Sequence, residues 1–152
     1  MLVPSAGQNR RVPIFGALDA VTGDVTALLT ERKRSDDMLD FLEYLFGHYA
    51  HFDVVTLFMD NCSIHHAQKV RDYLHACRNN VRVIWNAAYA PNLNLIERFW
   101  GHLKRSAFTN YFFETIGNLE QAILNQINAL NDDPSHPFRL RLNTVQNLRQ
   151  PT

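Results

Sequence analysis

The chain has 152 residues, a formal net charge of zero, 46% hydrophobic and 20% charged residues, which is ordinary for a single globular domain with a sizeable core. No apolar run reaches the roughly 20 residues of a membrane helix, and the N-terminus lacks the hydrophobic segment of a signal peptide. The 2 cysteines form neither a disulfide framework nor a zinc motif. We therefore expect a cytoplasmic protein without membrane contact. Zero net charge argues against a strongly basic nucleic-acid-binding protein. Any binding to DNA must therefore come from local clusters of basic residues.

The N-terminal part is expected to be a lead-in followed by a hairpin. Residues 1–11 include proline and glycine and are expected to be irregular. Val12–Ala20 and Val25–Thr30 are rich in strand-forming residues, and Gly23 lies in a turn signal between them. These residues predict two antiparallel strands joined by a tight turn.

The rest of the chain alternates between helices with periodic apolar residues and short apolar strands. The expected elements are a helix from Ser35 to Tyr49, a strand over Val54–Met59, a helix from His66 to Cys77, a strand over Val81–Trp85, a helix opening near Asn94 and a helix over Thr115–Asn131. The apolar run at Val54–Met59 predicts a strand buried on both faces. Trp85 and Trp100 are expected in the core. A hairpin followed by β-α-β-α units indicates a mixed sheet with helices packed on it.

The end of the strand at Met59 carries the first candidate functional residues. Asp60 and Asn61 follow the strand directly, and ligands of open α/β sheets bind outside the carboxyl ends of the strands. Asp60 is therefore a candidate metal ligand or catalytic group. The same two residues would also suit a local role, in which their side chains form an Asx turn and cap the next helix.

A second candidate is Glu97, in the sequence Y-A-P-N-L-N-L-I-E-R-F-W from Tyr89 to Trp100. Because Glu97 lies three residues after Asn94, the pair could cap a helix through a variant of the capping box. Alternatively, Glu97 lies at the edge of the apolar face of the helix and could direct its carboxylate to a divalent cation near the end of the strand. The helix pattern alone leaves both interpretations open.

Two motifs together resemble those of bacterial insertion-sequence DDE transposases in the Tc–mariner superfamily. The stretch D-N-C-S-I-H from Asp60 to His65 resembles the D-N-x-x-x-H motif of that family, and Tyr89–Trp100 resembles its Y-S-P-x-L-N-P-I-E-x-x-W motif. The separation of Asp60 from Glu97 is close to the family's spacing between its second and third acidic residues. Phe15–Asp19 looks like part of the family's hairpin, so the likeness covers residues 10–106.

This resemblance implies an α/β fold of the ribonuclease-H-like type, with a mixed sheet of a hairpin plus parallel strands, helices on both faces and no first core strand. The catalytic domain would cover residues 12–131, between the lead-in of residues 1–11 and a C-terminal tail of residues 132–152. The resemblance also implies that Asp60 and Glu97 are catalytic and hold Mg²⁺ or Mn²⁺, cutting and joining DNA strands at transposon ends. Hard cations do prefer oxygen ligands, and paired ions serve in-line phosphoryl displacement.

The family uses a third carboxylate, on a strand upstream of the hairpin. Asp19 falls too late for that role, at the hairpin turn, and is expected to be a turn residue. We therefore expect the chain to work with an upstream transposase segment or as a homodimer. The alternative hypothesis is a truncated, inactive transposase remnant that acts at most as a DNA- or protein-binding module.

Six polar residues near the two motifs are candidates for contacts with DNA or with the metal ligands: Asn61, His65, Asn94, Arg98, Lys104 and Arg105. His65 could contact a phosphate or a metal-bound water, or it could donate to a backbone carbonyl at the start of the next helix. The three basic residues could bind DNA phosphates or form a solvated polar face.

Overall fold

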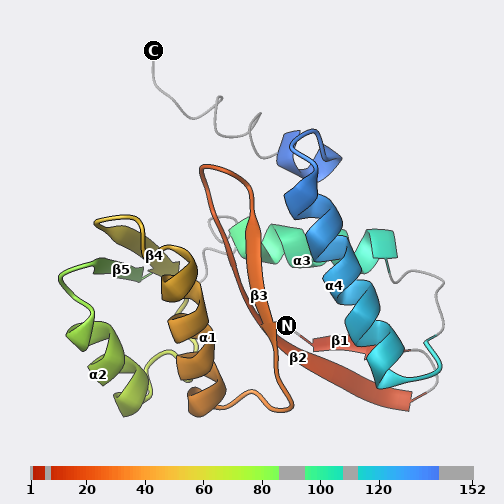
Figure 1. The fold of residues 1–152 in the computed structure, drawn as a ribbon. Helices are drawn as coiled ribbons and strands as arrows, with labels where there is room; N and C mark the ends of the chain where they lie inside the picture. The colour runs from red at the N-terminus through yellow and green to blue at the C-terminus, as the bar shows by residue number, and fades with distance from the viewer. Residues whose placement is uncertain (1, 6–7, 86–94, 108–112, 141–152) are drawn as a thin grey trace.

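The computed structural model describes residues 2–5, 8–85, 95–107 and 113–140, with side chains described from Val12 onward (Figure 1). The elements in chain order are β1 (Leu2–Ser5), β2 (Gln8–Leu18), β3 (Val25–Leu29), α1 (Ser35–His48), β4 (Val55–Met59), α2 (Gln68–Ala76), β5 (Val81–Trp85), α3 (Leu95–Ala107) and α4 (Ile116–Asp132). The predicted α/β fold with a hairpin, a parallel strand pair and helices on both sides is confirmed. No described helix combines the length and apolarity that crossing a membrane requires.

The first sheet is antiparallel, with strand order β1-β2-β3. The hairpin register runs from Ile14 opposite Leu29 to Leu18 opposite Val25, and Gly23 supplies the positive φ of 80° that the turn requires. The expectation of an irregular lead-in over residues 1–11 is wrong, because β1 pairs with the first half of β2. β1 and β2 are separated by only two residues in the sequence, and one of these is Gly7, so a hairpin signal was present and was interpreted as part of an irregular lead-in.

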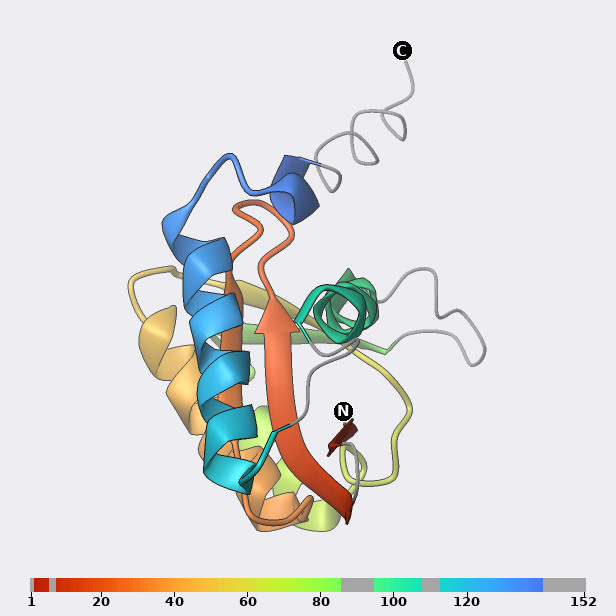
Figure 2. The ribbon, with the colours of Figure 1, turned by 90° about the vertical axis from the view of Figure 1, so that its right-hand side faces the viewer.

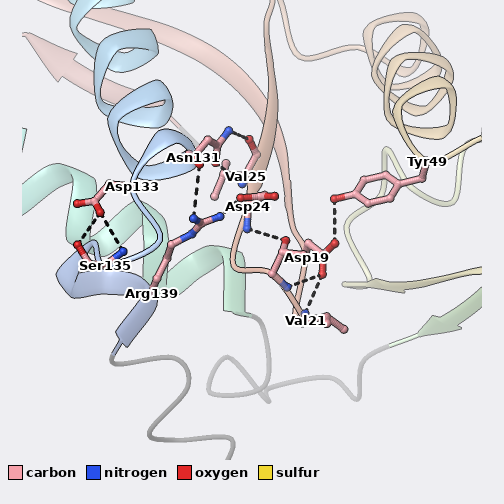
Figure 3. Close-up of polar contacts among 10 residues, drawn as sticks. Asp19, Val21, Asp24, Val25, Tyr49, Asn131, Asp133, Ser135 and Arg139 are labelled. Carbon is pink, nitrogen blue, oxygen red and sulfur yellow. Dashed lines mark hydrogen bonds and ion pairs between the residues drawn. The ribbon is translucent and has the colours of Figure 1, made fainter. Parts of the chain in front are cut away.

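The hairpin turn is held by Asp19, as expected for a turn residue. Its Oδ1 accepts from the backbone N–H groups of Val21 at 2.7 Å and Thr22 at 3.1 Å. Its Oδ2 accepts from the Tyr49 hydroxyl at 3.2 Å (Figure 3). Burial, and then the Asp19 carboxylate, raise the pKa of Tyr49 to about 12, so this hydroxyl remains a donor throughout the neutral range.

The second sheet is the parallel pair β4–β5, in register from Val55 opposite Val81 to Met59 opposite Trp85. The described strands thus form two hydrogen-bonded groups, the antiparallel sheet and this parallel pair. The expectation that Val54–Met59 is buried on both faces is wrong. Met59 is buried, but the neighbouring Phe58 is 61% exposed, because helices cover only one face of this pair and strand residues alternate between faces.

Helices α1 and α2 lie side by side, with α1 between α2 and the hairpin (Figure 1), and α1 contacts both β2 and β3. Phe15 of β2 stacks on Phe41 of α1 with ring centroids 6.0 Å apart. The same cluster contains Met59 of β4, Val70 of α2 and buried residues of α1 and β5. Because α1 contacts both sheets through one apolar cluster, it fixes the parallel pair beside the hairpin.

Helices α3 and α4 pack on the opposite side of the hairpin, as Figure 2 shows by looking along α3. Ile14 of β2 belongs to this second cluster together with Phe99 and Trp100 of α3. The members that α4 contributes are Leu119, Ile123, Ile127 and Leu130. Trp100 is 4% exposed, so the prediction that it lies in the core is confirmed. Trp85 is 39% exposed, and its assignment to the core is wrong.

The segment after α4 packs against the fold, although we expected residues 132–152 to be a tail. Phe138 is buried against Phe99, with ring centroids 5.5 Å apart. Arg139 is 7% exposed and forms an ion pair with Asp24 of the hairpin turn (Figure 3). The prediction failed for residues 136–140 because their burial depends on a partner far away in the sequence. Residues 141–152 lie outside the described residues.

Asn131 joins the end of α4 to the start of β3. Its side chain donates to the Val25 carbonyl at 2.8 Å and accepts from the Val25 N–H at 2.8 Å. We expect Asn131→Ala to lower the free energy of unfolding by about 2 kcal/mol, because both backbone groups lose their partner at a half-buried position. Thermal unfolding measures this. Asn125→Ala on the same helix is the matched control, since it removes only an exposed hydrogen bond with Gln121; equal effects in the two variants would contradict the assignment.

A candidate metal centre at the carboxyl end of β4

Asp60 is the first residue after β4, in a tight turn that leads into α2. The turn is closed by backbone hydrogen bonds from His65 to Cys62 at 3.0 Å and from His66 to Ser63 at 3.2 Å. The Cys62 N–H also donates to Asp60 Oδ1 at 3.1 Å. The Asx-turn contact expected from the sequence is therefore present. It occupies one carboxylate oxygen.

His65 donates to Asp60 from the far side of the same turn. Its Nδ1 lies 2.8 Å from Asp60 Oδ1 and 3.1 Å from the Asp60 backbone oxygen. Both partners are acceptors, so Nδ1 carries the proton. The His65 side chain is 18% exposed, whereas that of Asp60 is 48% exposed. The carboxylate thus faces solvent while its neighbouring imidazole is largely covered.

The second oxygen of Asp60 is available to a cation. Within the described part of the chain, no hydrogen bond or ion pair reaches Oδ2. A half-exposed carboxylate with one free oxygen suits a hard divalent cation, which prefers oxygen ligands and keeps several of its waters. The residues present at the end of β4 therefore fit a Mg²⁺ or Mn²⁺ ion.

Glu97 lies in the first turn of α3 and is exposed. The burial of Phe99, Trp100 and Leu103 against the hairpin fixes the helix on its opposite face. Figures 1 and 2 agree that the N-terminal end of α3 is turned toward the carboxyl ends of β4 and β5. Asn94, the expected capping partner of Glu97, lies outside the described residues.

No group of three or more His, Cys, Asp or Glu side chains able to hold a metal occurs among residues 2–5, 8–85, 95–107 and 113–140. Asp60 and Glu97 would thus need further ligands. Asp19, held in the hairpin turn, is committed to Val21, Thr22 and Tyr49, which agrees with its exclusion from the candidate ligands.

The remaining candidates lie around these two carboxylates. Asn61 is exposed, and its Oδ1 lies 3.2 Å from His66 Nε2. Arg98, Lys104 and Arg105 are exposed on α3. Lys104 and Arg105 lie in the last turn of this helix, where the helix dipole favours positive charge.

A ring stack that the sequence did not predict also borders this turn. The ring of His66 stacks on Trp85 at the end of β5, with centroids 4.4 Å apart. Trp85 lies opposite Met59 in the strand register, so this stack ties the turn after β4 to the end of β5. Because β4 and β5 are equally long, the sequence could have indicated that their carboxyl ends lie side by side. It could not have indicated that the Trp85 side chain faces outward.

The fold is that of a ribonuclease-H-like catalytic domain. The Mos1 transposase paired-end complex with left transposon end matches with a TM-score of 0.63 and 17% identity, over 93% of this chain and 44% of that chain. The Mos1 mariner paired-end complex with Mn matches with a TM-score of 0.61 and 19% identity, over 91% and 45%. A simian T-cell lymphotropic virus intasome, in complex with PP2A regulatory subunit B56 gamma, matches with a TM-score of 0.62 and 21% identity, over 82% and 45%.

The chain belongs to the DDE superfamily endonuclease family, whose sequence profile matches residues 2–120. It is 30% identical over 109 residues to the insertion element IS630 uncharacterized 39 kDa protein of Shigella sonnei, covering 72% of this chain and 32% of that protein. It is 33% identical over 96 residues to the Tc3 transposase of Caenorhabditis elegans, covering 62% and 28%. The predicted resemblance to Tc–mariner DDE transposases is confirmed, and the chain spans about a third of these relatives' length.

Proposed function

We propose that this chain forms part of the catalytic domain of a transposase that cuts DNA at transposon ends and joins the freed strand to a target. The observation that carries the proposal is the half-exposed carboxylate of Asp60 at the carboxyl end of β4, whose Oδ2 bonds to no described residue, in a chain of the DDE endonuclease family. Ligands of α/β folds bind at this edge of the strands.

In this proposal Asp60 and Glu97 hold a divalent cation, Mg²⁺ or Mn²⁺. The bound cation would activate the attacking oxygen and stabilise the leaving oxygen of an in-line phosphoryl displacement. The protein's own part is to bring two carboxylates from β4 and α3 together and to keep Asp60 in one orientation. The third carboxylate would come from an upstream transposase segment or from a homodimer partner.

The exposed basic residues of α3 are the proposed contact with DNA phosphates. Replacing Arg98, Lys104 and Arg105 together by alanine should weaken binding to any DNA sequence. It should also reduce the slope of log K against log salt, by about 0.9 for each phosphate that is no longer bound. Binding measured by fluorescence anisotropy at several salt concentrations gives both quantities. Arg78→Ala is the control, because Arg78 lies exposed just before β5, at the amino end of the parallel pair. An unchanged salt slope in the triple variant would exclude α3 from the DNA interface.

An inactive transposase remnant is the second candidate function. It stays a candidate because Asp60 and Glu97 account for two of the three carboxylates that the family uses. Calorimetric titration with Mn²⁺ distinguishes the two candidate functions. An active centre should bind Mn²⁺ in the wild type, and the Asp60→Ala variant should no longer bind it. Asp53→Ala, an exposed carboxylate before the other end of β4, should leave binding unchanged. A chain that binds no Mn²⁺ even with an upstream extension, or that binds it equally after Asp60→Ala and after Asp53→Ala, would favour the remnant.

A further inference from the structure

The largely covered ring of His65, 18% exposed, lies behind the half-exposed carboxylate of Asp60. The ring is turned back toward the end of β4, and its Nδ1 makes both of its described contacts with Asp60, one to the side chain and one to the backbone oxygen. His66, the next residue, points elsewhere: it is exposed, bonds to Asn61 and stacks on Trp85. The two adjacent histidines therefore have different surroundings and different partners.

The contacts of Asp60 are unequally divided between its two carboxylate oxygens. Oδ1 accepts from His65 Nδ1 at 2.8 Å and from the Cys62 N–H at 3.1 Å, whereas Oδ2 accepts from no described residue. Two donors on one oxygen, arriving from a backbone group and from a packed ring, hold the carboxylate in a single orientation. The remaining oxygen, Oδ2, belongs to a side chain that is 48% exposed.

We propose that His65 is a positioning residue that locks Asp60, so that only Oδ2 meets the metal and Asp60 binds it through one oxygen. The proposal rests on the proposed function, in which Asp60 is a metal ligand. It gives His65 a role through Asp60, because both described contacts of its ring run from Nδ1 to that residue. Groups that orient a ligand in this way contribute to metal affinity although they never touch the ion.

The hydrogen bonds from His65 to Asp60 can be detected in the absence of a metal ion. Both acceptors lie at Nδ1, so His65 must carry its proton on Nδ1 when the ring is neutral. In most histidines that are free of such contacts, the proton of the neutral ring is on Nε2. The ¹⁵N chemical shifts of the two ring nitrogens, measured at a pH where the ring is neutral, report this tautomer directly in the metal-free protein.

The decisive variants are His65→Asn, His65→Gln and His65→Ala. The amide nitrogen of asparagine occupies the position of Nδ1, and that of glutamine the position of Nε2, so only asparagine can restore the bond to Oδ1. We expect alanine and glutamine to weaken Mn²⁺ binding by about 10- to 100-fold, the range for residues that orient metal ligands. The asparagine variant should escape most of this loss and bind Mn²⁺ more tightly than the other two. His75→Ala, an exposed histidine on α2, is the control.

Calorimetric Mn²⁺ titration of the full chain, with the melting temperature of each metal-free variant, gives the test. Weakened binding in the alanine and glutamine variants with rescue by asparagine, at similar melting temperatures, supports the lock. Equal binding by the glutamine and asparagine variants, or an Nε2–H tautomer in the wild type, overturns it. Wild-type binding that is insensitive to Asp60→Ala removes the proposed metal ligand itself. The tautomer of His65 would still show whether its contact with the Asp60 carboxylate exists. A failure of Asp60 as a metal ligand can therefore be distinguished from a failure of His65 as its positioning residue.

Discussion

Asp60→Asn should abolish the metal-dependent nicking of DNA that is proposed for this chain, while leaving the fold intact. Asparagine keeps an oxygen that can accept from His65 and Cys62, but it replaces the free carboxylate oxygen by an amide and removes the negative charge. Metal stabilisation of a phosphoryl transfer is worth several kcal/mol, so the nicking rate should fall by about 10³-fold or more. Conversion of a supercoiled plasmid carrying the transposon ends to its open-circular form measures the rate.

The melting temperature of the Asp60→Asn protein is the control for this experiment. Asp60 is half exposed, so its replacement by a residue of the same shape should change stability little. The assay should be run with and without an upstream extension of the chain, since the third carboxylate is proposed to come from outside it. Residual nicking near the wild-type rate, in a protein that also needs Mg²⁺, would show that another residue holds the metal.

Gly16→Ala should be the most destabilising of the small substitutions in this chain. A Cβ at position 16 would lie 2.4 Å from Cζ2 and 2.8 Å from Cη2 of Trp100, and Trp100 is 4% exposed. The rigid indole packs between β2 and the rest of its apolar cluster and cannot move without opening the core. We expect the free energy of unfolding to fall by about 3 kcal/mol, in the upper part of the range for overpacked cores, and the melting temperature to fall by roughly 8 °C.

Gly47→Ala is the matched control, because it makes the same chemical change without the close approach. Gly47 is exposed near the end of α1, and a Cβ there would meet nothing within 4 Å. Alanine in a helix is favoured over glycine, so this variant should gain about 0.5 kcal/mol. Opposite signs for the two variants are the expected outcome. A Gly16→Ala protein as stable as the wild type would mean that Trp100 does not pack on β2 as described.

Local patterns were sufficient to predict most elements of this fold. Gly23 between two strand-forming runs predicted the hairpin, and the spacing of Leu119, Ile123, Ile127 and Leu130 predicted α4. Asp60 became a candidate because it follows an apolar strand, a signal that alone left a local capping role open. The motif around it favoured the role of a metal ligand, which stays a prediction. These predictions succeed because the turn, the helix period and the strand end are properties of consecutive residues.

Features set by distant partners were beyond such patterns. The burial of Arg139 beside Asp24 joins two segments that lie far apart in the sequence, and neither segment shows by itself that it meets the other. The outward-facing side of β4, with Phe58 exposed, likewise depends on where the helices pack. For His65 the motif identified the residue, but the alternatives of phosphate, water or carbonyl contact could be weighed only against the geometry of Asp60.

Whether Asp60 and Glu97 hold one common cation is tested most directly by a double-mutant cycle on Mn²⁺ affinity. Calorimetry on Asp60→Ala, Glu97→Ala and the double variant gives three free-energy changes. If both carboxylates bind the same ion, either single change removes most of the affinity and the double variant is little weaker still, so the changes are strongly non-additive. Additive changes, or a Glu97→Ala protein with wild-type affinity, would contradict the account.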